Sequence, residues 1–85
     1  MYLIFLENRA KKDLKKLDRR YKIRVSDFID KLQFNPFLGE KMSGKYDGFY
    51  RIKIPPLRII YLPDLKNKTI LIRAIGFRGS IYKLK

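Results

Sequence analysis

Cationic and apolar side chains alternate along residues 49–61, FYRIKIPPLRIIY, on both sides of two consecutive prolines. Such alternation predicts a β-hairpin, because successive side chains of a strand point to opposite faces. A two-residue turn at Pro55-Pro56 would pair Lys53 with Arg58 on one face. The same register places on the other face, against a core, Ile52, Ile54, Leu57, Ile59, Tyr50 and Tyr61. Like charges opposite each other destabilise a sheet, so we interpret the cationic face as a phosphate-binding site.

The remaining pattern predicts one strand, two helices and a further strand. Tyr2 to Leu6 is continuously apolar and predicts a strand, and apolar residues then recur every three or four positions over Glu7 to Leu17 and again from Tyr21 to Leu32. Asp18-Arg19-Arg20 is the expected connector, with Asp18 as a helix cap, and Asn35-Pro36 ends the second helix. Residues 37–48 lack periodicity and predict a loop, whereas Thr69 to Ile75 predicts a central strand.

This order of elements predicts an α+β fold with the arrangement β-α-α-β-β-β. Helices joined by a short connector are expected to form an antiparallel pair, packed on one face of a small, twisted, mostly antiparallel sheet. A length of 85 residues corresponds to a single domain over residues 1–85.

Charge is the strongest feature of the composition. The chain has 21 Lys and Arg against 8 Asp and Glu, a formal net charge of +13. This exceeds the roughly 2–8 charges that solubility requires and indicates nucleic acid, an anionic surface or an acidic protein as a partner, with nucleic acid favoured. The chain has no cysteine, and Tyr2 to Leu6 is too short for a signal-peptide core or a membrane span, so we expect a cytoplasmic protein without a membrane partner.

Several sequence motifs together resemble the RelE/ParE superfamily of toxins from toxin-antitoxin modules. They are Lys12-Asp13-Leu14, Asn35-Pro36, Gly44, Tyr50-Arg51-Ile52-Lys53 leading to Arg58-Ile59-Ile60-Tyr61, and Gly76-Phe77-Arg78 leading to Ile81-Tyr82. The resemblance implies an endoribonuclease that cuts messenger RNA, in many relatives on the ribosome and against the 16S rRNA backbone, until an acidic cognate antitoxin wraps around it. It implies no metal and no cofactor: the 2′-hydroxyl attacks the neighbouring phosphorus and leaves a cyclic phosphate.

The resemblance also implies a set of site residues. The family's basic pair falls on Arg51 and Lys53, its third-strand arginine on Arg58, and its C-terminal arginine and tyrosine on Arg78 and Tyr82. The chain has no histidine and no metal-ligand spacing, so cationic side chains are left to do the chemistry. Arginines can stabilise the extra charge on a pentacoordinate phosphorus, the role we assign to Arg58 and Arg78.

The other assignments concern proton transfer and stacking. Lys53 is expected to have a lowered pKa beside Arg58 and to transfer a proton, while Arg51 holds phosphate. Tyr82 either stacks on a base, transfers a proton or anchors the C-terminus in the core. Phe77 stands where many relatives have histidine or a basic residue and is a candidate for stacking on a nucleotide. Arg73 is expected to be a structural or surface charge.

Two other functions remain open at this stage. The same fold could belong to a ParE-like inhibitor that binds DNA gyrase and has no nuclease activity, because a fold does not fix a function. Alternatively, a non-catalytic RNA-binding protein, such as a small ribosomal component, would use the cationic face only to grip phosphate.

Overall fold

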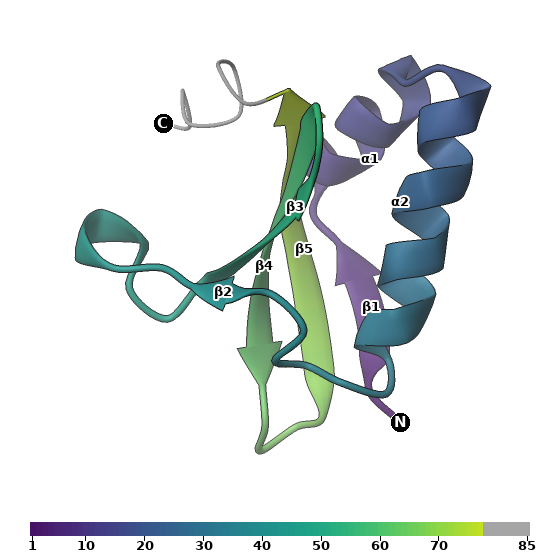
Figure 1. Cartoon of the computed structure of the whole chain (residues 1–85). Helices are drawn as coiled ribbons and strands as arrows, with labels where there is room; N and C mark the ends of the chain where they lie inside the picture. The colour runs from purple at the N-terminus through teal and green to yellow at the C-terminus, as the bar shows by residue number, and fades with distance from the viewer. Residues whose placement is uncertain (78–85) are drawn as a thin grey trace.

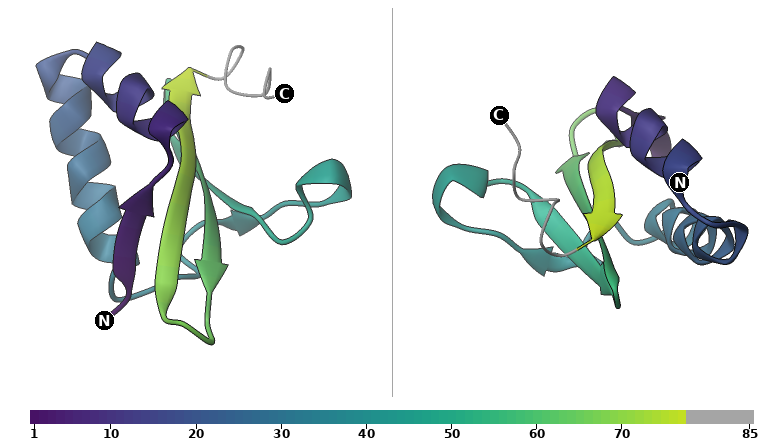
Figure 2. Two further views of the ribbon diagram at one scale, coloured as in Figure 1. Left: turned by 180° about the vertical axis from the view of Figure 1, so that it is seen from behind. Right: turned by 90° about the horizontal axis from the view of Figure 1, so that it is seen from above.

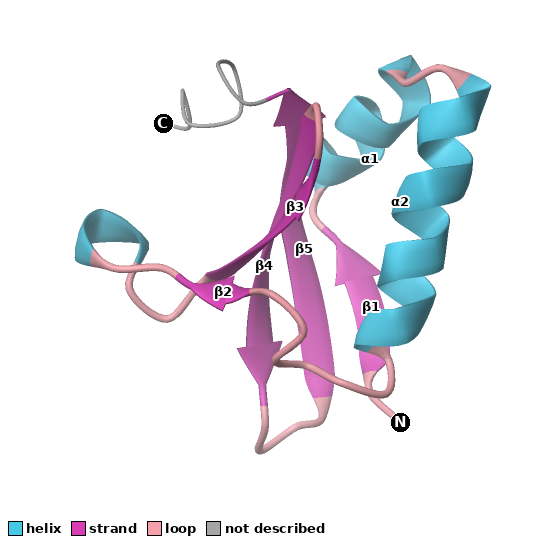
Figure 3. Cartoon of the chain, in the orientation of Figure 1, coloured by secondary structure: helices cyan, strands magenta, loops and turns pink. Residues whose placement is uncertain are grey.

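Two helices cover one face of a five-stranded sheet in the computed structural model, which describes residues 1–77 (Figure 1). The elements are β1 (Leu3–Leu6), α1 (Asn8–Lys16), α2 (Arg19–Leu32), β2 (Glu40–Lys41), a short 3-10 helix (Gly44–Tyr46), β3 (Tyr50–Ile54), β4 (Leu57–Asp64) and β5 (Thr69–Phe77). The strand order is β1-β5-β4-β3-β2; β1 is parallel to β5 and the other neighbours are antiparallel. The predicted α+β fold is therefore confirmed (Figure 3).

The structure differs from the sequence prediction in two local details. The predicted connector was too long, since α2 already begins at Arg19, and Asp18 precedes it without a side-chain capping hydrogen bond. The predicted loop over residues 37–48 was wrong in part, because it contains β2 and the 3-10 turn. The chain reverses direction between the two helices, and α1 lies inclined to α2 (Figure 2). Neither helix of residues 1–77 is long and apolar enough to cross a membrane.

The hairpin has the predicted register. Lys53 pairs with Arg58 and Tyr50 with Tyr61, around the turn formed by Pro55 and Pro56, whose peptide bond is cis. The predicted core face is confirmed, since five of its six residues are buried in the main hydrophobic cluster together with residues of both helices, and the sixth, Tyr50, is partly buried and packs against that cluster. Burial of these large apolar side chains is the main favourable term for the fold.

A β-bulge in β5 changes which side chains face the helices. Ile60 of β4 pairs with Ala74 and the next residue, Tyr61, pairs with Ile72, so Arg73 is the extra residue. The bulge reverses the alternation, and Ile75 joins the same core as Ile72 although the two are three positions apart. The odd-numbered residues that follow the bulge are thereby directed to the helix side.

The hydroxyl of Tyr61 ties the segment after α2 to the sheet. It donates a hydrogen bond to the Pro36 carbonyl and accepts one from the Gly39 amide, each at 2.9 Å. Burial raises the pKa of Tyr61, so this phenol stays a neutral donor. A Cβ at position 39 would lie 2.4 Å from the Arg51 carbonyl oxygen, so only glycine permits this approach. The segment thus enters β2 in a fixed position beside β3.

We predict that Tyr61→Phe lowers the free energy of unfolding by about 1–3 kcal/mol, because it leaves a buried carbonyl and an amide without their partner. Urea denaturation followed by circular dichroism measures the change. Tyr50→Phe is the matched control, since the Tyr50 ring stacks on Tyr61 with centroids 5.7 Å apart and only its hydroxyl is removed. Equal stability of the two variants would show that the Tyr61 hydrogen bonds are not important for the fold.

Candidate functional site

Three basic residues of the hairpin form what we call the cationic face: Arg51, Lys53 and Arg58. They lie on the side of the sheet opposite the helices, because they alternate with the core residues of β3 and β4. Lys53 and Arg58 are directly opposite in register, and Arg58 is also the partner of Gly76 in β5. The Lys53 side chain is 45% exposed and that of Arg51 is 30% exposed. The structure thus brings three predicted site residues together on a surface that an anion can reach.

Glu40 of β2 completes this cluster. It pairs with Arg51 in register, and its carboxylate lies 3.3 Å from Arg51 Nη2 and 3.5 Å from Lys53 Nζ. The hydrogen bond from Arg51, followed by the positive charge of Lys53, lowers the pKa of Glu40 below its usual value. Sequence reasoning missed this residue because it lay in the predicted loop. The pattern gave no pairing for β2, which is only two residues long.

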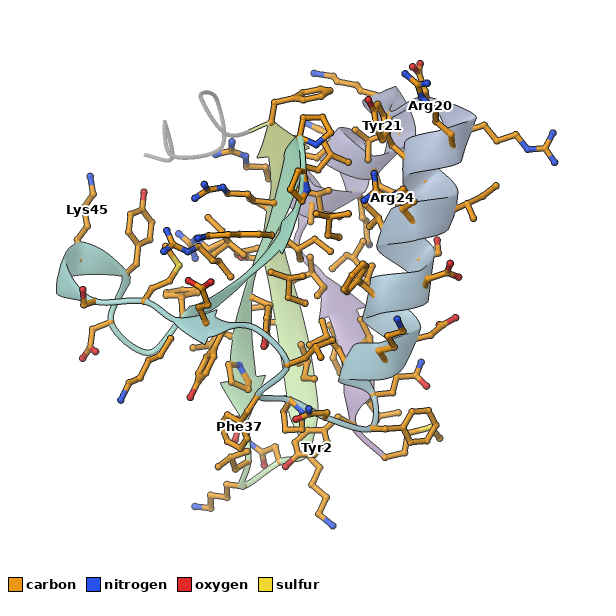
Figure 4. The ribbon with its side chains drawn as sticks, in the orientation of Figure 1. Tyr2, Arg20, Tyr21, Arg24, Phe37 and Lys45 are labelled. Carbon is orange, nitrogen blue, oxygen red and sulfur yellow. The ribbon has the colours of Figure 1, made fainter. Side chains whose placement is uncertain are left out.

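A cavity of about 290 Å³ adjoins the cationic face at the end of the hairpin. It is lined by Lys53, Pro55, Pro56, Leu57 and Arg58. The Arg24 guanidinium of α2 donates a hydrogen bond to the Pro55 carbonyl at 3.2 Å, which connects the turn to the helix layer. Figure 4 shows Arg24 on the part of α2 near the turn, together with Arg20 and Tyr21. Two of the three cations, Lys53 and Arg58, therefore border this cavity, and the turn that forms part of its wall is bonded to the helix layer.

Arg73 belongs to a different set of contacts. Its Nη1 lies 3.5 Å from the Glu7 carboxylate, and its guanidinium carbon is 5.3 Å from the centre of the Phe49 ring. Phe49 in turn packs on a small buried cluster on the same side of the sheet as the cationic face, made of Met42, Ile60 and Ala74. These contacts agree with the structural role expected of Arg73.

Phe77 lies on the helix side of the sheet, not on the cationic face. Its ring makes an edge contact with Tyr21 of α2, with centroids 6.1 Å apart, and the residue is 48% exposed. It pairs with the core residue Leu57, whereas Gly76 pairs with Arg58. The predicted site residues Arg78 and Tyr82 lie outside the described residues. Among residues 1–77, no group of three or more carboxylates could hold a metal ion.

Comparisons with known proteins point to one family. The family model described as "ParE toxin of type II toxin-antitoxin system, parDE" matches residues 4–82. A protein of Methanocaldococcus jannaschii named "Putative toxin RelE1" is 32% identical over 82 residues, which cover 92% of this chain and 91% of that protein.

Solved structures share the fold. The chain in the archaeal RelE-RelB complex from Pyrococcus horikoshii has a TM-score of 0.80 and 27% identity, over 93% of this chain and 97% of that chain. A chain of the toxin-antitoxin complex RelBE2 from Mycobacterium tuberculosis has a TM-score of 0.83 and 24% identity, over 91% and 98% of the two chains.

We predict that Arg51→Ala raises the pKa of Glu40 towards its usual value, and that Lys53→Ala raises it less, because the Arg51 hydrogen bond is the larger cause. A pH titration of the side-chain carboxyl followed by NMR measures both. A carboxyl with a lowered folded-state pKa stabilises the fold above its unfolded pKa, and this contribution is lost as the pH falls through the folded value. The carboxyl of Asp64, whose pKa is lowered chiefly by hydrogen bonds from Asn67, is an internal control that neither substitution should move.

Proposed function

This chain belongs to the RelE/ParE superfamily of toxins from type II toxin-antitoxin systems, and from that membership we propose that it is a metal-independent endoribonuclease that cleaves messenger RNA. The observation that carries the proposal is the cationic face. Lys53 and Arg58 are directly opposite in register on the outer face of the sheet and line the cavity at the end of the hairpin. The repulsion between their positive charges lowers the stability of the fold, and a bound phosphate would offset that repulsion.

The reaction proposed for this site is an internal transfer at phosphorus. The 2′-hydroxyl oxygen attacks the adjacent phosphorus, the bond from phosphorus to the 5′-oxygen breaks, and the products are a 2′,3′-cyclic phosphate and a 5′-hydroxyl end. One proton leaves the 2′-hydroxyl and one is delivered to the 5′-oxygen. Arg58 and Arg78 would stabilise the additional negative charge of the transition state, an effect of roughly 3–4 kcal/mol for a well-placed donor.

Proton transfer is assigned to Lys53, as the sequence suggested, and the structure adds Glu40 as its neighbour. The Glu40 carboxylate can hold the Lys53 ammonium in place, because it lies 3.5 Å from Lys53 Nζ. Alternatively, the carboxylate itself can accept the proton of the 2′-hydroxyl, because the Glu40 side chain is 57% exposed and RNA can reach it. Arg51 would bind phosphate, while Phe77 and Tyr82 would stack on bases, with proton transfer as a second role for Tyr82.

The partners that we propose are messenger RNA on the ribosome, in the cytoplasm, and an acidic antitoxin. The net charge of +13 favours both a polyanion and an acidic protein. The fold of this chain also occurs in the archaeal RelE-RelB complex and in the toxin-antitoxin complex RelBE2, which supports an antitoxin for this chain as well.

A second function is favoured by the description of the family model, which names ParE. A ParE-like toxin would bind DNA gyrase without cutting RNA. The presence of Arg51, Lys53 and Arg58 on one face supports the nuclease, since gyrase binding alone gives no reason for this arrangement.

We predict that Arg58→Ala combined with Arg78→Ala reduces cleavage at least about a thousandfold with circular dichroism unchanged, because two charge-stabilising donors are lost. The measurement is inducible expression followed by mapping of 5′ ends on a reporter messenger. Lys11→Ala with Lys66→Ala removes the same charge from exposed positions outside the cationic face and should cleave normally. Cleavage retained by the arginine double variant would exclude the proposed site. Growth arrest without cuts would favour gyrase binding, and RNA binding without arrest or cuts would favour a passive RNA-binding protein.

Lys53→Met should lower the cleavage rate about a hundredfold or more and change its pH dependence, because general acid-base groups contribute about that much. Single-turnover cleavage between pH 5 and 10 provides the profile, with Glu40→Gln measured in parallel. A profile unaltered by Lys53→Met but altered by Glu40→Gln would transfer the proton-acceptor role to Glu40.

A further inference from the structure

A second cavity lies between α1 and the end of β5, on the helix side of the sheet. Its volume is about 270 Å³, and Gly76 borders it together with Arg9, Asp13, Lys16, Leu17, Ile75 and Phe77. None of the residues of the cationic face lines it. The cavity is at the small end of the range of ligand sites, so it suits a single base or sugar-phosphate unit.

The lining combines an aromatic ring, an apolar floor and two cations. Leu17 and Ile75 are buried and form the floor, whereas Phe77 is 48% exposed at the rim. Arg9 and Lys16 lie seven positions apart on α1 and therefore project from the same side of the helix. Lys16 forms no ion pair with any residue of the described part of the chain. An exposed ring beside cations is a suitable surface for a base with its attached phosphate.

Asp13 fixes this arrangement. Its carboxylate accepts a hydrogen bond from the Ile75 amide at 3.0 Å and lies 3.6 Å from Arg9 Nε. The first contact fastens α1 to β5, and the second orients the Arg9 guanidinium and offsets part of its charge. Of the two cations that line this cavity, Lys16 is therefore the one whose charge no carboxylate of the described residues offsets, and it can interact with a ligand.

We propose that this cavity is a nucleotide subsite that takes a residue of the bound RNA next to the one at the cationic face. The base would stack on Phe77, and its phosphate would lie near Lys16. This inference rests on the proposed function, because it supplies the RNA strand.

The end of β5 brings the two sites close together. Gly76 pairs with Arg58, and the next residue, Phe77, faces the opposite side of the sheet at the second cavity. We expect neighbouring nucleotides of one RNA strand to contact the cationic face and the Phe77 cavity, which adjoin consecutive residues of β5.

The test measures binding of a fluorescein-labelled RNA tetranucleotide with 2′-O-methyl groups, which removes the attacking hydroxyl, by fluorescence anisotropy. Phe77→Leu keeps an apolar side chain against Tyr21 but removes the ring, and we expect about a five- to tenfold higher Kd, the lower range for loss of one stacked base. Phe77→Tyr should restore binding. Lys16→Ala should raise Kd. It should also lower the slope of log Kd against log salt concentration by about 1, the change expected when one phosphate contact is lost.

Matched controls come from the same chain. Phe34→Leu changes an exposed phenylalanine that does not line the cavity, and Lys12→Ala removes an exposed lysine of α1 outside it, so neither should change Kd. Thermal unfolding of each variant checks that the fold is kept.

The outcome separates this inference from the proposed function. Effects of Phe77→Leu and Lys16→Ala that persist in an Arg58→Ala background support an independent subsite, even if the wild-type protein cuts no RNA. Wild-type cleavage together with unchanged Kd values for Phe77→Leu and Lys16→Ala would overturn the subsite and leave the nuclease intact. Equal effects of the Lys12 and Lys16 substitutions would also overturn it, because they would indicate only a general dependence on charge.

Discussion

The register between β3 and β4 is the constraint on which the rest of the structure depends. A turn of two residues at Pro55-Pro56 aligns the strands so that three pairs of large apolar or aromatic residues face each other: Tyr50 with Tyr61, Ile52 with Ile59 and Ile54 with Leu57. All of these side chains then enter the core beneath the helices, and all the basic ones are directed to the opposite face. A shift by one residue would bury Lys53 and expose the isoleucines, which the cost of burying an unpaired charge forbids.

The same register imposes an electrostatic cost that the fold only partly offsets. Lys53 and Arg58 repel each other across the ladder, and Glu40 provides a counter-charge from β2 to Lys53 and Arg51. Glu40 can do so because Tyr61 holds the preceding segment on the sheet and Gly39 allows close approach to β3. Core packing and the arrangement of charges on the outer face are therefore linked through one buried tyrosine.

Much of this arrangement could be predicted from the sequence. The hairpin, its register and the two helices follow from alternation and three- to four-residue spacing, which are local patterns. The bulge at Arg73 could not be predicted, because it depends on how β5 meets β4 and leaves no periodic signal of its own. The placement of Phe77 on the helix side follows from that bulge. Glu40 was missed for a similar reason, since a strand of two residues is defined by its partner.

The fold also explains why the family alone does not determine the activity. Helix packing and sheet order depend on the core face of the hairpin, while the chemistry depends on residues of the outer face that contribute little to the core. Substitution of Arg51, Lys53 or Arg58 could therefore change function without changing architecture. In this chain the outer face carries Arg51 and Lys53 at 3.3 and 3.5 Å from the Glu40 carboxylate, and Arg58 is the register partner of Lys53. Lys53 and Arg58 face each other in the ladder, and a bound anion, as in the function proposed above, would offset their mutual repulsion.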